Sequence, residues 1–170
     1  MPIDIKFHSY HNMQNGTDKS GKYLLNVLAN CNPEYFGNER EGMMLDSIKS
    51  NILKRASGLI VRYIEKEVAC VLVVYNNVIH RVFTPIKYRR QGMMRTTLNV
   101  ITKLMIVSKC PFESPVERDL IPFFHSLGWK TDITDVPNVD GTIQMYLKEK
   151  QPPNTKIGIG SWVYILDNLC

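Results

Sequence analysis

The chain has 170 residues, a length that predicts one globular domain rather than two. With 44% hydrophobic and 22% charged residues, its composition matches an average soluble protein and excludes the disordered and collagen-like classes. No apolar run approaches the ~18 residues of a membrane span, and the first residues lack the apolar segment of a secretory signal. Four well-separated cysteines without a Cys/His cluster predict reduced thiols and no metal site. We therefore expect a soluble cytoplasmic protein.

The charge is distributed unevenly along the chain. There are 21 basic and 16 acidic residues, which gives a net charge of +5. Residues 57–112 contain nine bases and two acids, whereas residues 113–170 contain five bases and eight acids. A basic block of this kind favours a ligand with phosphate groups, such as a nucleotide, a nucleic acid or a coenzyme. The alternative is a solvated positive face that binds no ligand.

Hydrophobic periodicity predicts the elements of the first half of the chain. A strand over residues 3–10 is followed by two amphipathic helices, near residues 24–31 and 44–52. Three strands then form a meander with tight turns at Glu65-Lys66 and Asn76-Asn77, over residues 58–64, 68–75 and 78–84.

The second half of the chain predicts further helices and strands. A long helix after Gly92 has an inward stripe formed by Met94, Leu98, Ile101 and Met105. The segment 114–117 has the pattern of a capping box with proline at the first helical position, so we expect the next helix to begin there and to kink or restart at Pro122. Extended segments follow at Trp129 and over residues 143–147 and 162–166.

The basic turn between the third meander strand and the long helix is the feature that points to chemistry. It reads Arg89-Arg90-Gln91-Gly92. Backbone amides at a helix N-terminus bind anions, glycine lets the main chain approach a phosphate, and arginines add charge-assisted hydrogen bonds. A surface turn with incidental arginines is the alternative. Neither a Walker A loop nor a dinucleotide-binding glycine pattern occurs.

Together with the segment FFHSLGW, the sequence YRRQGMMRTTL after a meander resembles the GNAT superfamily of N-acetyltransferases. In that family the pyrophosphate loop reads Q/R-x-x-G-x-G/A, which Arg89 and Gly92 match, with Tyr88 as the preceding aromatic residue. Met94 departs from the final Gly/Ala. The resemblance covers residues 1–150 and implies an α+β fold. Its mixed, mostly antiparallel sheet is flanked by helices in the order β-α-α-β-β-β-α-β-α-β-β. Residues 151–170 would be a C-terminal extension packed on the same domain.

The resemblance also implies the substrates. Acetyl-CoA would be the co-substrate, without a metal, and the acceptor would be an amine on a small molecule or a protein. The pantetheine arm would bind the backbone of the strand and the pyrophosphate the loop, which implies the coenzyme-binding residues Val82, Phe83, Thr84, Arg89, Arg90, Gln91, Gly92, Met93, Met94 and Arg95. We expect a monomer or homodimer without a membrane partner. A nucleic-acid-binding domain is disfavoured because the basic segment lacks interleaved aromatic residues.

The candidate catalytic residues follow from the same resemblance. His80 is similar to a histidine of the arylalkylamine N-acetyltransferases and is the candidate general base; a structural, half-buried histidine is the alternative. The tyrosine that protonates the leaving thiolate in the family matches Phe124, which cannot donate a proton. Tyr88 is then the candidate acid, with Tyr146 or water as alternatives. If catalysis has been lost, the chain would be a weak or inactive GNAT-like protein whose basic face binds a partner.

Overall fold

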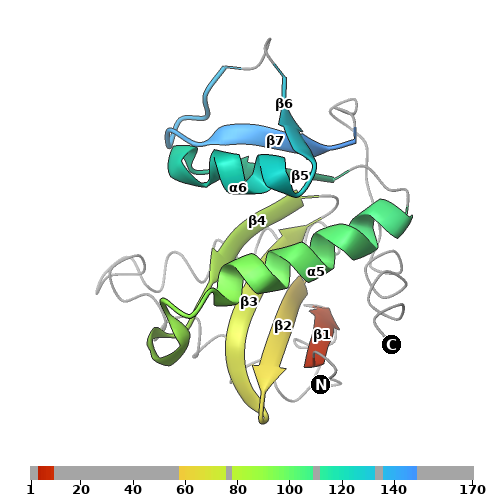
Figure 1. Ribbon diagram of the computed structural model, residues 1–170, viewed down its shortest axis with the longest axis vertical. Helices are drawn as coiled ribbons and strands as arrows, with labels where there is room; N and C mark the ends of the chain where they lie inside the picture. The colour runs from red at the N-terminus through yellow and green to blue at the C-terminus, as the bar shows by residue number, and fades with distance from the viewer. Residues whose placement is uncertain (1–3, 10–57, 76–77, 109–111, 133–135, 149–170) are drawn as a thin grey trace.

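A computed structural model of the chain describes residues 4–9, 58–75, 78–108, 112–132 and 136–148 (Figure 1). These residues form a seven-stranded sheet with the strand order β1-β2-β3-β4-β5-β7-β6. The strands are β1 (Asp4–Ser9), β2 (Gly58–Ile64), β3 (Glu67–Tyr75), β4 (Val78–Phe83), β5 (Phe112–Val116), β6 (Trp129–Thr131) and β7 (Ile143–Leu147). The helices are α5 (Met93–Ser108) and α6 (Ile121–Ser126), with 3-10 turns η1 (Ile86–Tyr88) and η2 (Arg118–Leu120).

The sheet is mixed but mostly antiparallel. All neighbouring strands pair in antiparallel fashion except β4 and β5, which are parallel. The predicted α+β class and the mixed sheet are therefore confirmed. The two helices predicted within residues 24–52, the strand predicted at 162–166 and the extension 151–170 lie outside the described residues.

The meander follows the sequence pattern closely. Glu65 and Lys66 form the two-residue turn between β2 and β3 with φ angles of 50° and 69°, the left-handed conformation that suits the twist of a tight hairpin. On β3, residues 68–74 are all buried, because this strand lies near the middle of the sheet and α5 crosses it (Figure 1). A continuous apolar run was the signal for this buried strand.

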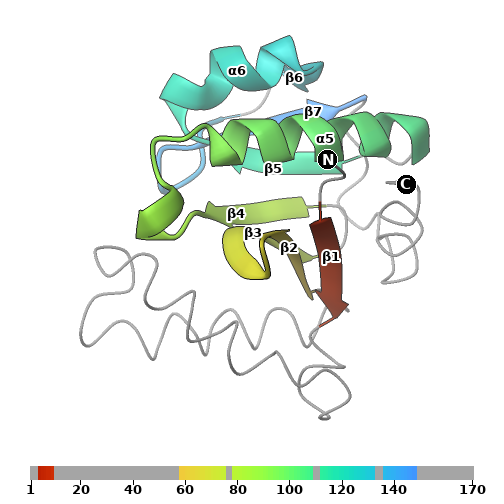
Figure 2. The ribbon, with the colours of Figure 1, turned by 60° about the horizontal axis from the view of Figure 1, so that its bottom comes forward.

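Helices α5 and α6 lie side by side over the sheet (Figure 2). Leu98, Ile101 and Met105 of α5 are buried in the core, as their spacing predicts. Two contacts tie α5 to the segment around α6. The Arg95 guanidinium lies 4.9 Å from the centre of the Phe123 ring, and the indole Nε1 of Trp129 donates to the hydroxyl of Thr102 at 3.1 Å.

The capping box predicted at residues 114–117 was wrong, because this segment is strand β5 and the turn that follows it. Residues 112, 114 and 116 are buried while 113 and 115 are half-buried, and β5 pairs with β7 along its whole length. This alternation outweighs the capping pattern. Pro115 has no backbone N–H to donate to a neighbouring strand, and a strand tolerates this where the neighbour on one side does not pair with it. This condition holds here, because β4 is registered with β5 only at Glu113. The helix begins later, and Pro122 lies in its first turn.

Candidate functional site

Two parallel strands separate at the centre of the sheet. β4 and β5 are joined by one registered pair, Val78 with Glu113. One residue further on, the hydroxyl of Ser114 donates to the carbonyl oxygen of Ile79 at 2.9 Å. Beyond this bond, the described residues of the two strands have no further pairing. The sheet therefore opens toward the C-terminal ends of β4 and β5.

A cleft occupies this opening. Its volume is about 190 Å³. Residues from β4, α5, β5, η2 and α6 line it, together with one residue between β5 and η2 and one before β7: Ile79, Val82, Met94, Leu98, Ser114, Pro115, Val116, Glu117, Leu120, Phe124 and Thr142. The lining is mainly apolar, so the cleft is suited to a slender chain with a few polar groups.

A second cavity, of about 170 Å³, lies at the basic turn. Its lining residues come from the position directly after β4, from η1, the turn and the first residues of α5: Thr84, Tyr88, Arg89, Arg90, Gly92, Met93, Met94 and Arg95. Met94 lines both cavities. The two cavities therefore adjoin at this side chain, and an extended ligand could occupy both.

The backbone of the basic turn has the geometry of an anion site. Arg90 and Gly92 have φ angles of 62° and 69°, and the space beside Gly92 is open. The first bond within the helix runs from the amide of Thr96 to the carbonyl of Gly92 at 3.0 Å. The amides of residues 93–95 precede it and are not used by the helix. Such amides, at the positive end of a helix dipole, bind phosphate groups.

Side chains also hold the turn in place. The Nε of Arg89 donates to the carbonyl of Thr84 at 3.2 Å, and Nε2 of Gln91 donates to the carbonyl of Lys87 at 2.9 Å. These bonds tie the turn to the end of β4 and to η1. The turn is thus preorganised before any ligand binds.

Glu67 at the start of β3 neutralises one of the cations near the turn. Its Oε2 accepts hydrogen bonds from Nζ of Lys87 and from the hydroxyl of Tyr88, each at 2.6 Å. These bonds lower the pKa of Glu67 and raise the pKa values of Lys87 and Tyr88. The positive charge around the second cavity therefore comes from the arginines of its lining.

A polar cluster below the first turn of α5 was not predicted from the sequence. Arg62 of β2 donates from Nη1 to the hydroxyls of Thr96 at 2.7 Å and Thr97 at 3.2 Å. Its buried Nε has no partner among the described residues. Burial raises the pKa of the nearby Cys70 thiol to about 11. The available signal was the single charged residue within the apolar strand GLIVRYI.

Most of the predicted coenzyme-binding residues lie at the two cavities. Val82 lines the cleft, and seven others line the second cavity, namely Thr84, Arg89, Arg90, Gly92, Met93, Met94 and Arg95. Phe83 is buried opposite Val71 of β3, and Gln91 is exposed and holds the turn.

The predicted catalytic residues are distributed differently. His80 lies in β4, and its side chain is outside the described part of the structure. Tyr88 lines the second cavity, with its hydroxyl bound to Glu67. Tyr146 is buried on β7 opposite Glu113. Phe124 lines the cleft and packs edge to face against Trp129, with ring centres 5.5 Å apart.

The described residues contain neither a metal-binding cluster nor a membrane-spanning helix. No group of three or more His, Cys, Asp or Glu side chains there is arranged to hold a metal ion. No helix there is long and apolar enough to cross a bilayer. His8 is paired instead with Tyr63, its Nε2 lying 2.9 Å from the phenol oxygen.

The sequence matches no protein-family model and no curated protein. Solved structures do match. The PaiA N-acetyltransferase of Thermoplasma acidophilum, in complex with coenzyme A, has a TM-score of 0.53 and 16% identity, with 88% of this chain and 100% of that chain covered. Escherichia coli ElaA has a TM-score of 0.57 and 20% sequence identity, with 86% of this chain and 100% of that chain covered. The structure of Tetrahymena GCN5 has a TM-score of 0.55 and 15% sequence identity, with 86% of this chain and 94% of that chain covered.

The chain has the GNAT fold. At these identities the likeness is one of fold, and it confirms the GNAT-like fold that residues 88–98 and the segment FFHSLGW implied. Within the GNAT fold of this chain, the opening between β4 and β5 and the basic turn before α5 are adjacent features.

Proposed function

We propose that this protein is an N-acetyltransferase that transfers the acetyl group of acetyl-CoA to an amine on a small molecule or a protein. The observation that carries the proposal is the pair of adjoining cavities, one basic and one mainly apolar, that share Met94. Coenzyme A has the matching polarity, with phosphates at one end and a slender arm that ends in a thioester. The PaiA structure with the same fold was solved with coenzyme A.

The residues present fit the coenzyme. Its pyrophosphate would bind the backbone amides of residues 93–95, with Arg89 and Arg90 adding charge. Its arm would lie along β4 from Thr84 to Val82. That edge of β4 is released from β5, so its backbone groups are available to a ligand that adds like a strand.

The reaction is acyl transfer from sulfur to nitrogen. The amine nitrogen attacks the thioester carbonyl, the C–N bond forms, and the C–S bond breaks. An alkylammonium loses two protons overall, of which one ends on the thiolate and the other on solvent. We propose His80 on β4 as the base. A rise of turnover with pH through the pKa range of histidine, lost in His80→Ala, tests this role.

The proton for the leaving thiolate is assigned to water. The hydroxyl of Tyr88 is held by Glu67, which raises its pKa, and a raised pKa weakens an acid. Phe124, which lines the cleft, has no proton to donate. A CoA thiolate is a fairly good leaving group near neutral pH, so the transfer can proceed slowly without a side-chain acid.

A second candidate function is a GNAT-like protein that binds the coenzyme or a partner without turnover. Two observations favour it. Phe124 places an apolar ring in the cleft wall, and Met94 departs from the Gly/Ala of the family's loop at the point where the two cavities meet. In that case the basic turn would serve binding alone.

Calorimetric titration with acetyl-CoA, followed by a thiol-release assay over a panel of amines, tests both candidates. We expect the wild type to bind and Gly92→Asp to lose at least tenfold in affinity, because the new carboxylate repels the phosphates. Gly128→Asp is the matched control, since Gly128 also has a positive φ, of 101°, and open space beside it. Equal binding by the three proteins would refute the assigned coenzyme site. Tight binding without thiol release would favour the second candidate.

A further inference from the structure

The wall of the cleft formed by β5 and η2 carries one carboxylate. Glu117 directly follows β5, and its backbone carbonyl accepts a hydrogen bond from the amide of Leu120 at 2.9 Å. Its side chain makes no capping bond to this turn. It lines the cleft, where it is the single ionisable group among the described lining residues.

The other polar groups of the lining are already engaged. The hydroxyl of Ser114 donates to the carbonyl of Ile79. The hydroxyl of Thr142 is bonded to a carboxylate oxygen of Asp140 at 2.6 Å and to the side-chain amide of Asn138 at 2.9 Å. By contrast, the carboxylate of Glu117 has no hydrogen-bond or ion-pair partner within the described residues. A polar group that enters the cleft can therefore bind this anion.

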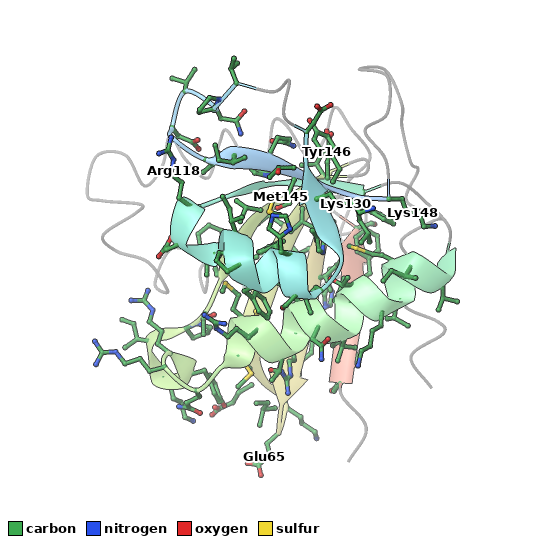
Figure 3. All side chains as sticks on the ribbon, turned by 45° about the horizontal axis from the view of Figure 1, so that its top comes forward. Glu65, Arg118, Lys130, Met145, Tyr146 and Lys148 are labelled. Carbon is green, nitrogen blue, oxygen red and sulfur yellow. The ribbon has the colours of Figure 1, made fainter. Side chains whose placement is uncertain are left out.

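The next residue along the chain does not cancel this charge within the cleft. Arg118 is exposed and is absent from the cleft lining. Figure 3 shows it at the outer edge of the molecule, at the opposite end from Glu65. Asp119, which follows, is also exposed and outside the lining.

The two cavities consequently differ in the sign of their charge. Arg89, Arg90 and Arg95 line one of them, whereas Glu117 supplies the formal charge in the described lining of the other. The phosphate end of the coenzyme is favoured at the first and repelled at the second. A cation has the reverse preference. The polarity thus orients the coenzyme with its phosphates at the basic turn, and it favours a cationic acceptor in the cleft beside the uncharged arm.

We infer that the acceptor is a cationic alkylamine, whether free or as a lysine side chain, and that Glu117 is the specificity-determining contact for its ammonium group. This inference rests on the proposed function. The carboxylate would hold the ammonium beside the cleft until a base removes its proton. Amines that are neutral at pH 7, such as arylamines, gain nothing from Glu117, and acidic amino acids are repelled by it. For an exposed charged contact, the gain corresponds to about three- to tenfold in KM.

Steady-state kinetics with acetyl-CoA test the inference. The acceptors are butylamine, a lysine-containing peptide with a blocked N-terminus, aniline and glutamate, and the proteins are the wild type, Glu117→Gln and Asp119→Asn. The last is the matched control, because it removes the same charge two residues further on. We expect a cationic amine to be the best acceptor, with KM raised about three- to tenfold by Glu117→Gln and unchanged by Asp119→Asn. Turnover at saturation and the affinity for acetyl-CoA should stay unchanged in both variants.

The outcomes separate this inference from the proposed function. Calorimetry that shows no acetyl-CoA binding by the wild type would overturn the function itself. If acetyl-CoA binds but no acceptor of the panel leads to thiol release, the proposed function fails as well; if thiol is released only with aniline or glutamate, the assigned acceptor class is wrong. A neutral or acidic amine as the best acceptor, or an equal KM for Glu117→Gln and Asp119→Asn, would also overturn the role of Glu117.

Discussion

The hydroxyl of Ser114 and the carbonyl of Ile79 hold β4 and β5 together at the point where the two strands separate. The bond is 2.9 Å long, buried, and next to the one registered pair of these strands. Because Ile79 and Ser114 both line the cleft, this bond fixes the closed end of the opening. A side chain thus replaces a ladder bond at the place where the site begins.

Ser114→Ala should destabilise the protein by about 1–3 kcal/mol, because it leaves a buried carbonyl without its partner. Urea unfolding measures the loss. Ser126→Ala is the control: its hydroxyl also bonds a main-chain carbonyl, but at an exposed position, so we expect a change below about 0.5 kcal/mol. Equal effects of the two substitutions would show that the bond between the strands contributes little.

Local features of the site were predictable from the sequence, and features made by distant segments were not. The basic turn could be predicted because strand, turn and helix follow one another within residues 78–108. The positions of Glu117 and Arg62 could not. Glu117 reaches the cleft because β4 and β5 separate, and Arg62 reaches α5 across 34 residues of sequence. No periodicity encodes either contact.

The error at residues 114–117 has a similar cause. Serine, proline and glutamate at these spacings form a local helix-start signal. The buried alternation from Phe112 to Val116, paired with β7, is a tertiary effect that overrides it. By contrast, the strands Gly58–Ile64 and Ile143–Leu147 were predicted with the bounds they have, because their apolar residues agree with the burial that the sheet imposes.

Substitutions of Met94 should change coenzyme affinity according to size, because this side chain lies where the two cavities meet. Met94→Trp adds bulk at the junction and should weaken acetyl-CoA binding at least tenfold, equivalent to about 1.4 kcal/mol. Met94→Ala should bind as tightly as the wild type or more so. Calorimetry measures both affinities, and thermal unfolding shows that both variants are folded. If Met94→Trp bound acetyl-CoA normally, the coenzyme could not pass through this junction.

Cys70 should make the stability of the fold fall at alkaline pH. Burial raises the pKa of its thiol to about 11, whereas an unfolded cysteine titrates near ~8.5. The neutral thiol is therefore favoured in the folded state. Its contribution to the free energy of unfolding is complete below the pKa of the unfolded state and is lost as the pH rises through the pKa of the folded state. Between these values the wild type should lose about 1–3 kcal/mol relative to Cys70→Ala. Urea unfolding at several pH values tests this, and parallel pH profiles for the two proteins would contradict it.

Phe124→Tyr should raise turnover by about tenfold, because it adds a proton donor to a ring that lines the cleft and general-acid groups accelerate such steps. The gain is modest because the CoA thiolate already leaves readily near neutral pH. The ring should keep its edge-to-face contact with Trp129. Phe123→Tyr is the matched control, since Phe123 packs under Arg95 and is absent from the cleft lining; its thiol-release rate should equal that of the wild type.

An equal rise in both variants would point to a general effect of the hydroxyl, and a fall in Phe124→Tyr would show that the cleft requires an apolar wall. If acetyl-CoA binds tightly but neither the wild type nor Phe124→Tyr releases thiol with any acceptor, the chain uses its GNAT fold for binding alone.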